Sequence, residues 1–114
     1  MDSRLIYETS KHLKSEIQWN RATESEWIYC GSKGEVKFDI VLKHIRDHFA
    51  DSKLYVVLIR NVAFETYKEN IFKAVGDLIG SSDFLIWDIR FEKVIEFNKI
   101  GVFREGKSIV PIRI

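Results

Sequence analysis

Six consecutive apolar residues, 54–59, constrain the fold more than any other part of the chain. A transmembrane helix needs about 20 apolar residues, so this run is far too short to cross a bilayer. It also lacks the alternation of apolar and polar residues that marks a strand with one solvated face. An uninterrupted run of this length is typical of a strand buried on both faces, and we expect it at the centre of a sheet.

A second apolar run, residues 84–87, follows after a stretch with helical spacing. Gly80 is placed to end that helix, which is predicted over residues 63–79. Its apolar side chains recur at intervals of three and four: Phe64, Tyr67, Ile71, Val75 and Leu78. A strand, a helix and a second strand in this order predict a βαβ unit with parallel strands and a right-handed crossover.

Helical periodicity also appears outside this unit. Residues 2–18 and 39–51 each carry one apolar stripe, which favours amphipathic helices that pack on the sheet. Residues 90–98 fit either a short helix or a strand.

Several short strands are predicted in the remaining sequence. Residues 26–30 fit a strand that pairs with 35–38, unless a helix begins directly after Gly34. The C-terminal part predicts two short strands around a turn, with Pro111 favouring an edge position for the last one: 100–103, 108–110 and the turn 105–107. The fold class is therefore α+β, with α/β as the alternative: one domain over 1–114, with a mixed sheet, a βαβ core and packed helices.

Charge and cysteine content exclude some classes of protein. The chain has 18 Lys and Arg against 17 Asp and Glu, a formal charge of +1, which disfavours a dedicated nucleic-acid or membrane-surface binder. The single Cys30 cannot form an intramolecular disulfide, and the N-terminus lacks an apolar signal-peptide run. We expect a soluble cytoplasmic protein without a cofactor, a nucleic-acid partner or a membrane partner.

His44 and His48 are four residues apart in a predicted helix, a spacing that lets two imidazoles meet one metal ion. No glutamate directly follows His44, which excludes a zincin motif. A third ligand would have to come from elsewhere, such as His12, Asp47 or Asp51. The alternative is two surface histidines on a solvated helix face, with His44 pointing away from the apolar stripe.

Polar residues follow both apolar runs. In a parallel sheet, ligands bind beyond the carboxyl ends of the strands. Arg60 and Asn61 at one strand end, with Asp88 and Arg90 at the other, therefore form a candidate small-ligand site. The alternative is an Arg60–Asp88 salt bridge that closes this edge.

Two further patterns carry weaker chemical signals. Glu35 and Lys37 would share one strand face, as in Mg²⁺-dependent nucleases of the restriction-enzyme type, but Glu105 and Lys107 repeat the spacing in a predicted turn. Cys30 could act as a nucleophile only beside a base, and the alternative is a small buried hydrophobe.

A candidate protein interface lies where aromatic and charged residues gather: Trp19, Arg21, Glu24 and Glu26. Trp and Arg are frequent anchors of protein interfaces. We therefore favour a non-catalytic protein-binding module, similar in size to small cytosolic inhibitors or bacterial toxin-immunity proteins, with another protein as its partner. The alternatives are a ligand- or metal-dependent enzyme, such as a nuclease-like domain, and a structural homodimer that pairs through an edge strand at 109–114.

Overall fold

The computed structural model describes residues 2–20, 26–32 and 34–109. Seven strands, three α-helices and two short 3₁₀ segments are present in this part of the chain. They are, in order, α1 (Ser3–Leu13), η1 (Lys14–Glu16), β1 (Ile17–Trp19), β2 (Ile28–Tyr29), α2 (Phe38–His48), β3 (Lys53–Ile59), β4 (Val62–Tyr67), η2 (Lys68–Asn70), α3 (Ile71–Val75), β5 (Phe84–Asp88), β6 (Lys93–Asn98) and β7 (Val102–Ser108).

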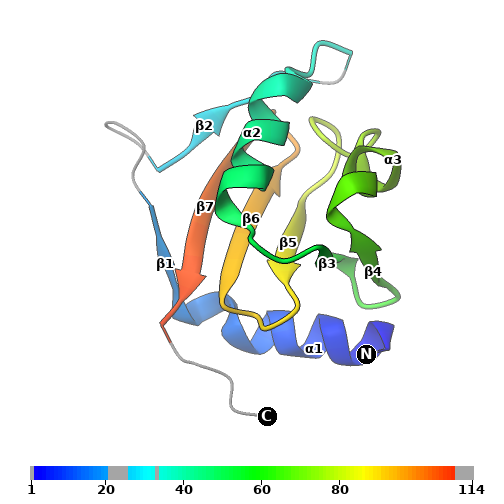
Figure 1. Ribbon diagram of the computed structural model, residues 1–114, viewed down its shortest axis with the longest axis vertical. Coiled ribbons are helices and arrows are strands. Elements are labelled where there is room, and N and C mark those ends of the chain that lie inside the picture. Colours follow the sequence, from blue (N-terminus) through cyan, green and yellow to red (C-terminus); the bar gives the residue numbers. More distant parts are fainter. Residues whose placement is uncertain (1, 21–25, 33, 110–114) are drawn as a thin grey trace.

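All seven strands belong to one antiparallel sheet (Figure 1). Its order is β1-β7-β6-β5-β3-β4, and β2 pairs with the same side of β7 as β1 does. β1 pairs with the C-terminal half of β7, through Ile17–Ser108, and β2 pairs with its N-terminal half, through Ile28–Phe103. The long strand β7 therefore joins two chain segments that are separate in sequence.

Helices pack on both faces of this sheet. We call the side on which α2 and α3 pack the α2 face, and the opposite side the α1 face. Along β3, Leu54 and Val56 belong to the core of the α2 face, whereas Tyr55 and Val57 belong to the core of the α1 face. The prediction of a strand buried on both faces is confirmed for residues 54–57, and β3 is an inner strand between β4 and β5. It lies next to the edge strand β4 rather than at the centre of the sheet, and Ile59 at its end is exposed.

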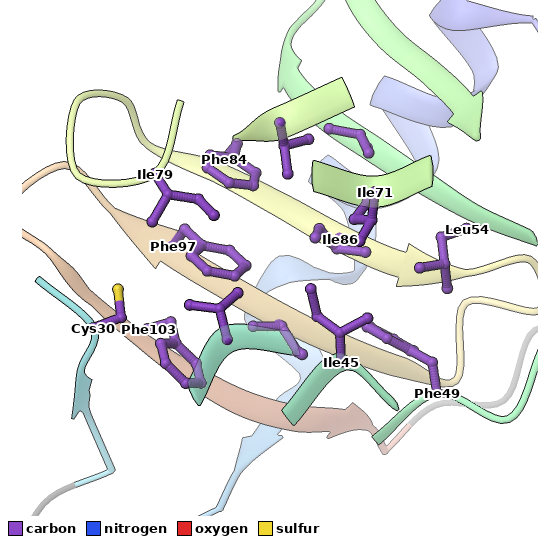
Figure 2. Packing of buried hydrophobic residues seen from close by; sticks show 14 residues of the cluster. Cys30, Ile45, Phe49, Leu54, Ile71, Ile79, Phe84, Ile86, Phe97 and Phe103 are labelled. Atoms are coloured by element: carbon purple, nitrogen blue, oxygen red, sulfur yellow. The ribbon is translucent and has the colours of Figure 1, made fainter. Parts of the chain in front are cut away.

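The core of the α2 face is the larger of the two and is rich in phenylalanine (Figure 2). Phe97 stacks on Phe84 at a ring-centroid distance of 4.6 Å and on Phe103 at 5.4 Å. Ile45 on α2 and Phe49 directly after this helix belong to the same core (Figure 2). Cys30 lies in the same cluster and is fully buried, as the small-hydrophobe alternative predicted.

The predicted βαβ core is wrong. Residues 62–67 form β4, which pairs with β3 in a hairpin whose loop is Arg60-Asn61, and only residues 71–75 form the helix α3. β3 and β5 are consequently antiparallel neighbours, with Leu54 opposite Asp88. The aromatic and β-branched residues of 62–67 suit a strand, and a two-residue loop is sufficient to join antiparallel strands.

Other predicted elements also change. Residues 93–98 form a strand, which decides between the two alternatives for 90–98. Residues 35–37 do not pair as a strand, and α2 begins at Phe38. The predicted C-terminal turn is wrong, because β7 runs continuously through 105–107. The edge strand proposed for a homodimer, 109–114, lies outside the described residues except for Ile109, which belongs to no strand.

Gly106 has a packing function rather than a turn function. A Cβ atom at this position would lie 2.7 Å from Ile17 Cγ2 and 2.8 Å from Trp19 Cε3. The absence of a side chain on β7 therefore lets both β1 side chains fold closely over the α1 face.

Candidate functional site

Helix α1 crosses the strands at one end of the sheet (Figure 1) and is held there by polar contacts. The buried Trp87 Nε1 donates a hydrogen bond to Ser10 Oγ at 2.9 Å. The backbone N–H of Ala63 donates to Ser3 Oγ at 3.2 Å. These bonds, one to β5 and one to β4, fix the helix on the α1 face.

One transverse row of this face runs from apolar to charged. Val57 pairs with Leu85, Leu85 pairs with Glu96, and Glu96 pairs with Arg104. The first two side chains are buried, and the two charged ones are partly exposed. Along this row, the α1 face therefore changes from apolar at β3 and β5 to charged at β6 and β7.

A cleft of about 430 Å³ lies between α1 and this part of the sheet. Its helical wall carries Tyr7, Lys11 and Lys14. The facing side contributes Asp83, directly before β5, and Glu96 on β6. Lys14 Nζ lies 3.8 Å from Glu96 Oε2, so an ion pair spans the cleft at one end.

Next to the cleft, Arg104 lies between two tryptophan rings. Its Cζ is 3.9 Å from the ring centroid of Trp19 and 4.4 Å from that of Trp27. Its Nε donates to Glu96 Oε1 at 2.7 Å, and its Nη1 donates to Glu26 Oε1. The guanidinium is therefore fixed by two carboxylates in addition to two aromatic rings, a geometry that lysine could not reproduce.

We call this set of residues the Arg104 cluster: Trp19, Glu26, Trp27, Glu96 and Arg104. Two members of the predicted interface, Trp19 and Glu26, meet in it, whereas Arg21 and Glu24 lie outside the described residues. Sequence reasoning missed Arg104. Had residues 102–108 been predicted as one strand, the alternation would have placed Arg104 and Gly106 on one face and Glu105 on the other.

A second cluster lies on the α2 face. The Nδ1 atoms of His44 and His48 both face the carboxylate of Glu105 on β7: the first contacts Oε1, and the second lies 3.5 Å from Oε2. The interpretation of His44 as pointing away into solvent is wrong, since its ring also packs edge-on against Phe103 at 5.1 Å. Glu105 was missed because its position was predicted as a turn.

The other ring nitrogen of His48 is bound to the sheet. Its Nε2 lies 3.1 Å from the carbonyl oxygen of Val94 and 3.0 Å from that of Gly106. Carbonyl oxygens only accept, so Nε2 carries the hydrogen and donates to both. Within the described ranges, no three His, Cys, Asp or Glu side chains are arranged to hold a metal ion, and this includes His44, His48 and Glu105.

The four residues of the predicted small-ligand site do not meet. Because β3 and β5 are antiparallel, Arg60 and Asn61 lie at the opposite end of the sheet from Asp88 and Arg90. The first pair borders a cleft of about 330 Å³ beside the start of α1. The Arg60–Asp88 salt bridge considered as the alternative is excluded by the same topology.

Asp88 has a structural position in the β5–β6 turn. Its buried Oδ1 accepts from the backbone N–H groups of Glu92 at 2.7 Å and of Lys93 at 3.2 Å. Burial raises the pKa of the Asp88 carboxyl, the two N–H groups lower it, and the nearby Asp51 and Glu92 carboxylates raise it further. Arg90 instead pairs with Asp51, with 3.6 Å between Nη2 and Oδ1.

The two weaker chemical signals lose their structural basis. Glu35 and Lys37 lie in the segment between β2 and α2, so they do not share a strand face. Cys30 Sγ donates to the carbonyl oxygen of Gly101 at 3.3 Å, and burial raises the pKa of its thiol. A raised thiol pKa opposes thiolate formation, which a cysteine nucleophile requires.

Comparison of the chain with known protein families, with curated proteins and with solved structures found no match. None of the helices in the described part of the chain is long and apolar enough to span a membrane.

Proposed function

We propose that the protein is a non-catalytic module that binds another protein, comparable in size and fold class to small cytosolic inhibitors and bacterial toxin-immunity proteins. The binding surface is the Arg104 cluster together with the adjacent cleft. The observation that carries the proposal is the half-buried stack of Trp19, Arg104 and Trp27 at the border of this cleft.

The chemistry of the Arg104 cluster supports this proposal. Trp and Arg are enriched among the residues that contribute most to protein–protein binding. Arg104 is held by two rings and two carboxylates, so it has little side-chain entropy left to lose when a partner binds.

The cleft supplies the second feature of a protein interface. Leu85 and Val57 line it as apolar residues, and Lys11, Lys14 and Asp83 provide charge around them. An apolar centre within a polar rim is the usual composition of an interface between folded proteins. A side chain inserted by the partner would lie next to the fixed guanidinium.

Affinity capture from a lysate of the source organism tests the proposal when matched variants are compared. Trp27→Ala removes one ring of the Arg104 cluster, whereas Tyr67→Ala removes an exposed ring from β4 on the far edge of the sheet. We expect the wild type and Tyr67→Ala to retain one stoichiometric partner and Trp27→Ala to lose it. Thermal unfolding curves of all three proteins serve as the control that each of them is folded.

Two results would overturn this proposal. The first is that the wild type retains no stoichiometric protein. The second is that Trp27→Ala and Tyr67→Ala retain the same partner equally well, which would place the binding surface elsewhere. Arg104→Lys serves as a second variant, because it keeps the charge and removes the planar stacking group.

A further inference from the structure

Strand β4 forms one edge of the sheet (Figure 1), and in the described part of the chain β3 is its only strand neighbour. The backbone N–H of Lys68 donates to the carbonyl oxygen of Ser52 at 2.7 Å, towards the β3 side. Because successive residues of a strand direct their backbone groups to opposite sides, those of Glu65 and Tyr67 point away from β3. Both residues are exposed, so this part of the edge presents backbone groups that can pair with another strand.

Helix α1 closes the other half of the same edge. Ser3 Oγ accepts a hydrogen bond from the backbone N–H of Ala63 at 3.2 Å and donates to the carbonyl oxygen of Arg60 at 3.5 Å. Ser3 therefore satisfies the outward N–H group next to the β3–β4 loop. Only the C-terminal half of β4, up to the start of η2 at Lys68, is open for pairing.

The side chains beside the open half determine which strand can pair there. Lys53 Nζ lies 3.9 Å from Glu65 Oε1 and 5.6 Å from the centroid of the Tyr67 ring. In an antiparallel pair, residues whose backbone groups point towards the other strand lie opposite one another. If two copies of β4 paired with Glu65 opposite Glu65, two like charges would meet, which is unfavourable. Pairing that includes Ala63 is prevented by Ser3.

One register of two antiparallel β4 strands satisfies both conditions. It places Glu65 of each copy opposite Tyr67 of the other, and Thr66 opposite Thr66. A shift further towards η2 would leave only Tyr67 in the ladder, since the strand ends there. In the favoured register, Glu65 lies beside a ring over which Lys53 of the second copy is placed, so that opposite charges meet at both ends. Opposite-charge pairs and Thr–Thr pairs both stabilise neighbouring strands.

We propose that two copies of the chain pair through β4 in this register and form a dimer with one continuous antiparallel sheet. Each Glu65–Tyr67 pair exchanges two backbone hydrogen bonds, and the two-fold axis passes between the two Thr66 residues. The contact is small, so the dimer dissociates on dilution. Because β4 and β1 are at opposite edges of the sheet, both Arg104 clusters stay open, and the dimer does not depend on the proposed protein partner.

Sedimentation velocity of the full chain, from micromolar to near-millimolar concentration, tests the dimer. We expect the wild type to change from monomer to dimer as its concentration rises. Glu65→Lys brings like charges together at both ends of the contact and should weaken the dimer at least about ten-fold. The double variant Lys53→Glu with Glu65→Lys restores the opposite charges and should dimerise again. Glu35→Lys, the same change at an exposed position between β2 and α2, should have no effect.

Cysteine cross-linking tests the register. Thr66→Cys places two thiols opposite each other where the Cα atoms are about 4.5 Å apart, within reach of a disulfide. Oxidation with diamide should therefore convert Thr66→Cys into a covalent dimer. In Glu65→Cys the two thiols are offset by two residues, roughly 7 Å along the strand, and should not link. The native Cys30 is fully buried and should not react in either variant.

Three results would overturn the proposal: a wild type that stays monomeric at the highest concentration, a Glu65→Lys variant that dimerises as strongly as the wild type, or a Glu65→Cys variant that links as readily as Thr66→Cys. A monomeric wild type whose captured partner is lost in Glu65→Lys would instead assign this edge to a strand of another protein. If Glu65→Lys fails to fold, the cross-link in Thr66→Cys decides the result.

Discussion

Strands β6 and β7 present different pairs of residues on the two faces of the sheet. On the α2 face, Phe97 pairs with Phe103 under the helices, whereas one residue along, Glu96 pairs with Arg104 beside the cleft of the α1 face. The same two strands thus carry a sealed apolar contact on one side and a charged, partly exposed contact on the other. Phe97 and Phe103 therefore hold the fold together, whereas we expect Glu96 and Arg104 to be available for binding.

The largest expected effect is on the sealed face. Phe97→Ala removes a ring that stacks on both Phe84 and Phe103 and is 1% exposed. We expect the free energy of unfolding to fall by about 3–5 kcal/mol, measured by urea denaturation. Phe97→Leu should cost less because it leaves a smaller cavity. Equal losses in Phe97→Ala and Arg104→Ala would contradict the difference between the two faces.

A smaller effect is expected where β1 packs on the α1 face. Gly106→Ala places a methyl group against Ile17 and Trp19, and overpacking of this kind costs about 1–3 kcal/mol. The displaced Trp19 ring should also leave Arg104, which a change in tryptophan fluorescence would report. Lys107→Ala, at an exposed neighbour in β7, is the control and should change stability by less than about 0.5 kcal/mol. Unchanged fluorescence in Gly106→Ala would show that β1 tolerates the methyl group.

The sequence predicted the sealed face better than the open one. Residues 54–59 and 84–87 were recognised as buried strands because burial on both faces leaves a local signal, an uninterrupted apolar run. Most of β4 falls within the helix predicted over 63–79, because Phe64, Tyr67 and Ile71 also fit a helical period. Its pairing with β3 depends on the two-residue loop Arg60-Asn61, which is interpreted from the sequence as a strand end and candidate ligand site rather than as a hairpin loop.

The candidate site was predicted only in part, and the reason lies in strand register. Trp19 and Glu26 were identified from composition, but Arg104 and Glu105 become informative only when β7 is one unbroken strand. Alternation along β7 then sends Arg104 to the α1 face and Glu105 to the α2 face. The contacts of Arg104 with Trp19 and Glu26 and the contact of Glu105 with His44 have no local sequence signature, because each joins residues more than fifty positions apart.

Arg104→Lys sharpens the comparison within the open face. The substitution keeps the positive charge between Glu26 and Glu96 and removes the planar group that stacks on Trp19 and Trp27. We expect a loss of about 0.5–2 kcal/mol in the free energy of unfolding, smaller than at Phe97. Lys107→Arg is the matched control in the same strand. A loss as large as that of Phe97→Ala would mean that the Arg104 cluster holds the fold together.

The smallest expected effect is a pH dependence of the stability that arises in the turn after β5, where Asp88 lies. Burial raises the pKa of Asp88 in the folded protein above its ordinary value of about 3.9, so the folded state favours the protonated carboxyl. The stability contributed by this shift is fully present below that ordinary value and is lost as the pH rises through the folded pKa.

Asp88→Asn cannot titrate, yet its amide oxygen can still accept from the N–H groups of Glu92 and Lys93. We measure the free energy of unfolding of both proteins by urea denaturation from about pH 7 to about pH 4. The value for the wild type should rise relative to that of Asp88→Asn as the pH falls. A difference that stays constant with pH would mean that the two N–H groups fully offset the cost of burying the carboxylate. A difference that moves in favour of the variant at acid pH would mean that they outweigh this cost.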